Sequence, residues 1–232
     1  MASDQRFAVL AMSVFPAVQA RSLYRFYRIG DEEALALQGV SLSVTAGEFV
    51  VVAGPSGSGK STLLNCLAGM DDPDGGSVDI GGQRLSHRSE QVRARIRARH
   101  VGMLFASGNL FDHLTVTENL RLAAALAGRH RSTDQAGLLR ELGVAERGHA
   151  LPSQLSGGEL TRAAVAVAVV NRPLVVFADE PTGELDSSTE ADVLRVLTAI
   201  AEQGTAIVVA SHSAAVAAAA GRVLHLTDGR LT

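Results

Sequence analysis

A glycine-rich stretch of nine residues constrains the fold of this chain more than any other part of its sequence. It fits the phosphate-binding pattern G-x-x-x-x-G-K-[S/T]. An apolar run over residues 49–53 precedes it and predicts a buried strand. After it, Leu63, Leu64 and Leu67 share one face of a predicted helix, so the pattern has the strand and helix that it requires. The stretch consists of Gly54, Pro55, Ser56, Gly57, Ser58, Gly59, Lys60, Ser61 and Thr62.

The chemistry of this loop suits a nucleotide with Mg²⁺. Glycines can take positive φ, which turns backbone N–H groups toward a bound phosphate, and the helix N-terminus adds the positive end of its dipole. Lys60 can reach the outer phosphates, and the Ser61 hydroxyl can bind Mg²⁺. The alternative is a glycine turn that merely precedes a lysine, and the matching strand and helix argue against it.

The composition allows one large domain and excludes several other classes of protein. The 232 residues are 47% hydrophobic and 19% charged, which is enough for a sizeable core. A net charge of −3 gives no reason to expect a nucleic-acid partner. The single cysteine, Cys66, cannot form an internal disulfide and is expected to be a packed core residue. No run reaches the roughly 18 apolar residues of a membrane span, so any membrane contact is expected through a partner.

The rest of the chain carries both strand and helix patterns, and we expect an α/β fold. The segment 107–148 shows no strand pattern, so we interpret about 107–165 as an inserted helical lobe. Pro16 interrupts the apolar N-terminal stretch, which predicts an irregular lead-in over residues 1–17 and not a secretory signal. The expected strands cover residues 18–27, 36–44, 49–53, 77–80, 101–105, 174–178, 206–210 and 223–226.

Two adjacent carboxylates follow a continuous apolar run that reads as a central strand buried on both faces. They are Asp179 and Glu180, and α/β proteins bind ligands at such strand ends. We assign Asp179 to Mg²⁺ and Glu180 to the attacking water. An exposed acidic turn before Pro181 is the alternative.

A second candidate anion site lies at Ser156, Gly157 and Gly158, whose amides and hydroxyl could bind a γ-phosphate. The same residues also predict a helix start, with Ser156 as N-cap and Glu159 at the capping-box position. One nucleotide does not need two phosphate sites from one chain. A head-to-tail dimer resolves this, because each nucleotide can then be bound by the Lys60 loop of one copy and the Ser156 loop of the other.

Two aromatic side chains complete the candidate site. His212 follows an apolar strand and could sense the γ-phosphate, although a lone histidine can also be structural. Tyr27 could stack on adenine through its ring, or it could be a core tyrosine at a strand end. The three carboxylates Asp71, Asp72 and Asp74 are expected to be solvated turn formers and not metal ligands.

Five motifs, in this order, resemble those of the ATP-binding subunit of ABC transporters, over a match that runs from about Val18 to the C-terminus. They are residues 54–62, 155–159, 174–180 with Pro181, 183–186, and His212. Residues 178–183, Glu159 and residues 114–119 look like the branch that serves lipoprotein release, macrolide export and cell division.

The resemblance implies a P-loop NTPase fold with a mainly parallel core sheet, an antiparallel β-subdomain and the helical lobe, all in one domain over residues 18–232. It also implies ATP hydrolysis by a homodimer, or a dimer with a sister cassette, docked on a transmembrane permease at the cytoplasmic face of the cell membrane. Tyr27 falls where the family has its adenine-stacking aromatic, and Asp186 falls in a loop that crosses the dimer interface.

Two positions depart from the family's pattern. Ala106 replaces a glutamine that contacts Mg²⁺ and the attacking water, and an alanine methyl can do neither. Val167 replaces an arginine in the helix after the 155–159 motif. We therefore expect slower hydrolysis or weaker coupling to the permease. The alternative is a slow or non-hydrolysing dimer clamp that signals to a membrane partner.

Overall fold

A computed structural model describes residues 15–29, 32–128 and 134–232. Most of the predicted N-terminal lead-in therefore lies outside the described residues. The bounds are β1 Val18–Ile29, β2 Glu32–Val44, β3 Phe49–Ala53, α2 Lys60–Ala68, β4 Gly75–Ile80, β5 Gln83–Arg84, α3 Glu90–His100, β6 Val101–Leu104, α4 Val116–Leu126, α5 Gln135–Glu141, η1 Ala145–Arg147, η2 Pro152–Gln154, α6 Gly157–Val169, β7 Val175–Asp179, α7 Ser187–Glu202, β8 Ala206–Ala210, α8 Ala214–Ala219, β9 Arg222–Thr227 and β10 Arg230–Leu231.

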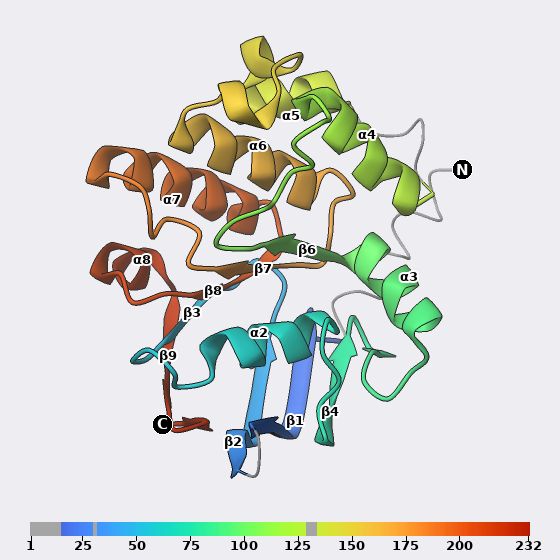
Figure 1. Cartoon of the computed structure of the whole chain (residues 1–232), viewed down its shortest axis with the longest axis vertical. Helices are drawn as coiled ribbons and strands as arrows, with labels where there is room; N and C mark the ends of the chain where they lie inside the picture. Colours follow the sequence, from blue (N-terminus) through green and yellow to red (C-terminus); the bar gives the residue numbers. More distant parts are fainter. Residues whose placement is uncertain (1–14, 30–31, 129–133) are drawn as a thin grey trace.

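A six-stranded sheet forms the centre of the molecule, in the order β10-β9-β3-β8-β7-β6 (Figure 1). The pairs β9–β3, β3–β8, β8–β7 and β7–β6 are parallel, and only β10 pairs antiparallel. The apolar run before Asp179 forms β7, where residues 175–178 are fully buried. The expectation of a buried central parallel strand is therefore confirmed.

Alternate residues of the central strands pack into two separate hydrophobic clusters, as the two-residue period of a strand requires. Val51 and Val176 face the cluster that contains α4, α6 and α7 residues, whereas Val50 and Phe177 face the cluster that contains α2 residues. Helices α2 and α6 therefore lie on opposite sides of the sheet (Figure 1). Cys66 of α2 is buried as expected, and burial raises the pKa of its thiol to about 12.

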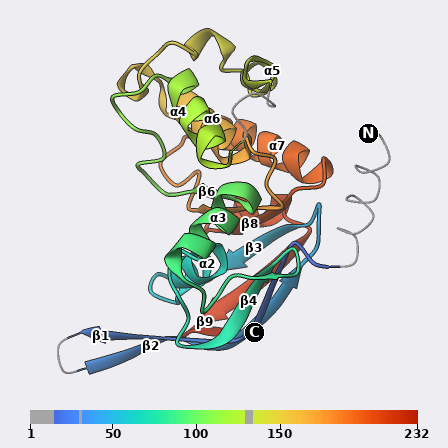
Figure 2. The ribbon, with the colours of Figure 1, turned by 90° about the vertical axis from the view of Figure 1, so that its right-hand side faces the viewer.

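A second sheet, in the order β2-β1-β4-β5, is antiparallel throughout and packs on the α2 side of the molecule. The ends of β1 and β2 extend away from the rest of the fold (Figure 2). Strand β2 begins at Glu32, four residues before the predicted start, because residues 32–35 pair with β1 although the two adjacent glutamates at its start do not predict a strand.

The helical lobe contains α4, α5 and α6, but residues 107–114 are not helical, so that part of our prediction was wrong. The backbone N–H and C=O groups of this segment form hydrogen bonds with side chains and not with a helical backbone. The buried Asn119 side chain binds both backbone groups of Phe111 and the carbonyl oxygen of Leu114. Thr115 is the N-cap of α4, and Glu118 completes a capping box with it.

Candidate functional site

The glycine loop joins β3 to α2 at the carboxyl edge of the parallel sheet. Other parts of the backbone approach the loop so closely that two of its glycines have no room for a side chain. A Cβ at Gly54 would lie 2.1 Å from the carbonyl oxygen of Leu226. Gly59 has a φ of +102°, and a Cβ there would lie 2.5 Å from the carbonyl oxygen of Ala36. The helix starts at the next residue, Lys60, so its first N–H groups are directed toward the loop.

Polar groups inside this loop fit a phosphate ligand. The Lys60 ammonium group donates to the carbonyl oxygens of Gly54 at 2.8 Å and Pro55 at 3.0 Å, which holds its charge over the loop. The buried Ser58 hydroxyl has no hydrogen-bond partner among the described residues. A phosphate would give these donors an acceptor together with the N–H groups at the start of α2.

The structure brings Glu180 and His212 together, although 32 residues separate them. His212 Nδ1 lies 2.8 Å from Glu180 Oε1, and the buried Ser211 hydroxyl donates to Glu180 Oε2 at 3.0 Å. Glu180 follows β7 and Ser211 follows β8, its parallel neighbour. Glu180 has a φ of +45°, a backbone strain that persists only where surrounding contacts fix it. Our sequence reasoning missed Ser211, which its place at a strand end beside His212 could have indicated.

The two residues predicted to bind Mg²⁺ also lie at this edge. Ser61 is the second residue of α2, and Asp179 is the last residue of β7. A hydroxyl and a carboxylate are oxygen ligands of the kind that Mg²⁺ prefers. Within the described residues no group of three histidine, cysteine, aspartate or glutamate residues could hold a metal ion. Mg²⁺ bound mainly through substrate phosphates needs only one or two protein ligands, so the donor set fits.

The predicted Ser156 loop begins α6, on the other side of the core sheet from α2. Ser156 and Glu159 form the expected capping box. Arg147 donates to Glu159 at 2.8 Å, and this contact together with the Ser156 bonds lowers the pKa of Glu159 to about 2. Gly157 and Gly158 share a cleft of about 440 Å³ with Asp186.

Asp186 is the N-cap of α7, and both of its carboxylate oxygens accept hydrogen bonds. One accepts from the hydroxyl of Ser188 at 2.6 Å, and the other accepts from the hydroxyl of Thr189 at 2.6 Å. These bonds hold the pKa of the Asp186 carboxyl well below its usual range. The loop that contains Asp186 therefore has a fixed shape next to the Ser156 loop.

Tyr27 lies beside the glycine loop and contacts its last residue, Thr62. The Tyr27 hydroxyl donates to Asp71 at 2.9 Å, and the Arg25 guanidinium lies 4.7 Å from the ring centroid. Arg25 also pairs with Asp71 at 2.8 Å and with Asp74 at 3.0 Å. Asp71 and Asp74 lie in the expected turn and stay partly exposed, and they also pair with Arg25, because β1 packs beside β4 and brings this cation to them.

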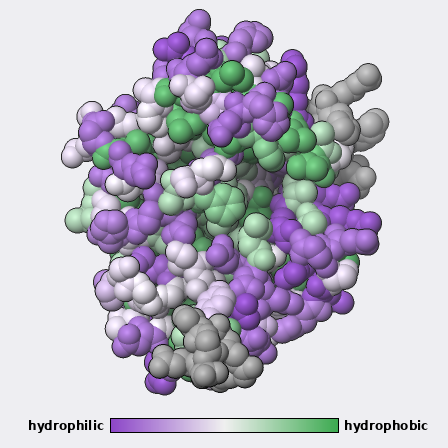
Figure 3. All heavy atoms as spheres, viewed as in Figure 1, coloured by the Kyte–Doolittle hydropathy of each residue, from purple (hydrophilic) through white to green (hydrophobic). Residues whose placement is uncertain are grey.

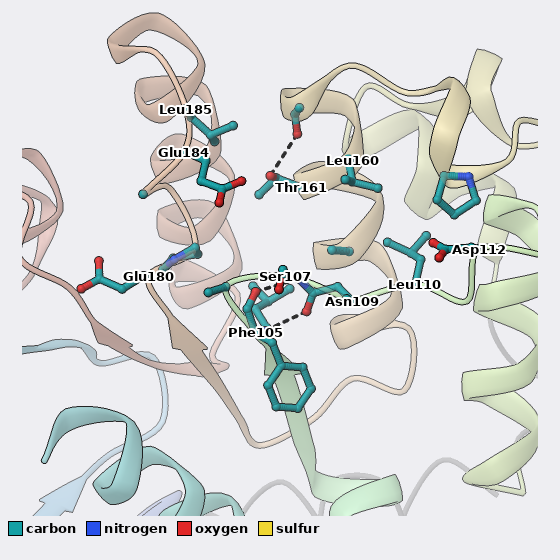
Figure 4. A pocket seen from close by; sticks show the side chains of 18 of the residues that line it. Phe105, Ser107, Asn109, Leu110, Asp112, Leu160, Thr161, Glu180, Glu184 and Leu185 are labelled. Carbon is teal, nitrogen blue, oxygen red and sulfur yellow. Dashed lines mark hydrogen bonds between the residues drawn. The ribbon is translucent and has the colours of Figure 1, made fainter.

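A cleft of about 510 Å³ separates the helical lobe from the β7 end, and Ala106 and Glu180 both line it. Both apolar and polar residues border a hollow on this face of the molecule (Figure 3). The Asn109 side chain accepts from the backbone N–H of Phe105 and donates to its carbonyl oxygen, both at 2.7 Å (Figure 4). Asn109 thus fixes the backbone of Phe105, directly before Ala106, a feature that our sequence reasoning missed. Val167 of α6, the other position that departs from the family's pattern, packs against the hydrophobic cluster on the α6 side of the sheet.

Comparisons with known proteins match most of this chain. The sequence profile of the ABC transporter family matches residues 37–183. The macrolide export ATP-binding/permease protein MacB of Hyphomonas neptunium is 42% identical over 93% of this chain and 34% of its own length. MacB of Burkholderia pseudomallei is 40% identical over the same shares. The chain therefore spans about a third of the length of these curated relatives.

Solved structures extend the match to the whole fold. The ATP-binding cassette MJ0796, in a dimeric post-hydrolysis state bound to ADP and Pi, is 33% identical with a TM-score of 0.85, over 92% of this chain and 96% of that chain. The cassette MJ1267 in its ADP conformation is 20% identical with a TM-score of 0.80, over 94% of this chain and 90% of that chain, and shows the fold alone. The profile match and the likeness to MJ0796 together show that this chain belongs to the ABC transporter family, as one of its ATP-binding cassettes.

Proposed function

We propose that this chain binds Mg-ATP between two copies of itself, hydrolyses it and thereby drives a membrane permease. ATP binding and hydrolysis follow from its membership of the cassette family. The observation that carries the proposal is the grouping of three elements at one edge of the parallel sheet. These are the Lys60 loop after β3, Glu180 after β7 and His212 after β8.

Each residue of this edge has a distinct task in hydrolysis. Lys60 and the N–H groups of its loop stabilise negative charge on the phosphates. Glu180 accepts a proton from the attacking water, while Ser211 and His212 hold its carboxylate in position. Ser61 and Asp179 would hold Mg²⁺, which when bound neutralises charge on the phosphate oxygens. Tyr27 would bind the adenine ring from its place beside Thr62.

The Ser156 loop supports a two-copy arrangement. It lies across the core sheet from the Lys60 loop of its own chain, so it is free to meet the nucleotide of a second copy. Asp186, in the cleft beside it, would lie at the same interface. The cassette MJ0796 is dimeric in its solved structure, which supports the same assembly. A dimer with a sister cassette would use the same contacts.

The relatives and the cleft beside Ala106 support a permease partner. MacB is named as an ATP-binding/permease protein, and this chain corresponds to a third of its length. Over the described part of the chain, none of the helices is long and apolar enough to cross a bilayer. We propose that residues 18–232 form one cassette domain, with its helical lobe over about 107–165 and its permease contact in that cleft. It would then act at the cytoplasmic face of the cell membrane, without nucleic acid.

The test of this function measures dimer formation and phosphate release in one series. With saturating Mg-ATP we expect the chain to sediment as a dimer and to release phosphate, and with ADP we expect a monomer, because the γ-phosphate links the two copies. A chain that stays monomeric with Mg-ATP and releases no phosphate would contradict the proposal. A stable ATP-bound dimer without phosphate release would favour the non-hydrolysing clamp.

Placing a glutamine at residue 106 tests whether the alanine there, which departs from the family's pattern, slows hydrolysis. Ala106→Gln is expected to raise turnover by about 2- to 10-fold, the equivalent of one hydrogen bond of about 0.5–1.5 kcal/mol to the water or the Mg²⁺ shell. Asn109 already fixes the backbone of the preceding residue, Phe105, so the new side chain starts from a defined position. Steady-state phosphate release is measured with Ala106→Leu as the control for added volume. Equal rates in the parent and the glutamine variant would show that Ala106 does not limit hydrolysis.

A further inference from the structure

One carboxylate in α7 joins the two loops that flank Glu180. Glu190 Oε1 accepts from the Thr182 hydroxyl at 2.9 Å and from the Ser213 hydroxyl at 2.8 Å. Thr182 belongs to the turn that follows Glu180, and Ser213 directly follows His212. Thr182 is only 4% exposed, so its hydroxyl depends on a protein acceptor. A single oxygen atom therefore ties the turn after β7 to the loop after β8.

The hydrogen bonds continue from Ser213 to the catalytic carboxylate. The Ser213 N–H donates to the Ser211 hydroxyl at 3.1 Å, and that hydroxyl donates to Glu180 Oε2 at 3.0 Å. A hydroxyl has one proton to donate, so the direction of each hydrogen bond in this series is fixed. Ser211 accepts from Ser213 and must direct its proton at Glu180. Ser213 in turn directs its hydroxyl proton at Glu190.

We propose that Glu190 is a positioning residue for ATP hydrolysis, which acts through Ser213 and Ser211 on the orientation of the Glu180 carboxylate. This inference rests on the proposed function. Removing the Glu190 carboxylate leaves Thr182 and Ser213 without their acceptor and allows the loop that contains His212 to shift. Glu180 has a strained backbone at φ +45°, so its side chain direction depends on these surrounding contacts. A carboxylate aimed away from the water loses efficiency as a base without loss of nucleotide affinity.

Two substitutions separate the acceptor role of Glu190 from its size and charge. Glu190→Ala is expected to lower kcat by about 10-fold, because one or two hydrogen bonds are lost. The KM for ATP is expected to change by less than about twofold. Glu190→Gln keeps an oxygen that accepts from both hydroxyls, so it is expected to stay within about threefold of the parent rate. The control is Glu202→Ala, which removes an exposed carboxylate from the other end of α7 and is expected to match the parent.

A measurement that does not depend on turnover completes the test. The ring signals of His212 are followed by NMR in the nucleotide-free chain, with their assignment made from His212→Gln. We expect Glu190→Ala to shift these signals and Glu190→Gln to leave them in place. An unchanged kcat in Glu190→Ala, unchanged His212 signals, or a glutamine variant as slow as the alanine variant would each overturn the inference. If the parent chain releases no phosphate, the proposed function fails, and the NMR comparison still decides whether Glu190 positions this loop.

Discussion

Glu180→Gln is expected to abolish turnover while the ATP-bound dimer accumulates. A glutamine amide has nearly the same shape and can still meet Ser211 and His212, but it cannot take a proton from water. Loss of a general base lowers the rate by roughly 100- to 10,000-fold. Binding energy from both copies is kept, so the γ-phosphate continues to link them. Phosphate release and light scattering on a sizing column, both in Mg-ATP, measure the two effects together.

The matched control is Glu146→Gln, which makes the same change at an exposed position in the helical lobe. It is expected to turn over at the parent rate and to return to monomer once ATP is spent. A Glu180→Gln chain that stays monomeric in saturating Mg-ATP would rule out the role given to Glu180. A Glu180→Gln chain that keeps more than about a tenth of the parent rate would show that another group serves as the base.

Lys60→Ala is expected to weaken ATP binding by on the order of 10- to 100-fold, because a hydrogen bond to a charged group contributes about 1.5–3 kcal/mol. The ammonium group is held over the loop by the Gly54 and Pro55 carbonyl oxygens, so its position is set before the phosphate arrives. A fluorescent ATP analogue titrated into both chains measures the change. Arg195→Ala, which removes an exposed cation from α7, is the control and is expected to bind like the parent.

A second readout is available because Lys60 is the only lysine in the sequence. An amine-directed reagent can therefore modify only this side chain and the N-terminal amine. We expect Mg-ATP to protect Lys60 from modification, since the phosphates would cover its ammonium group. Equal labelling with and without nucleotide, or unchanged affinity in Lys60→Ala, would contradict the assignment of this loop.

Local features of the site were predictable because their residues are close in the sequence. The glycine loop, its strand and its helix lie within 20 residues, and β3 and β8 have the predicted bounds. The capping box at Ser156 was likewise predicted and confirmed, since capping spacing acts within one turn of a helix. Segment 107–114 was mispredicted because Asn119, outside the segment, supplies its backbone bonds.

What the sequence determined by itself was the chemistry: a phosphate loop at Lys60, two carboxylates at a strand end and a histidine after the next strand. These signals depend on residue type and short spacing, which the chain carries wherever it folds. Only the tertiary structure decided which groups meet. The pairing of β7 with β8 brings Ser211 and His212 to Glu180, and the packing of α7 brings Glu190 to Ser213. A hydrogen bond acts over about 3 Å, and no pattern along the chain fixes distances of that size between residues 23 to 32 positions apart.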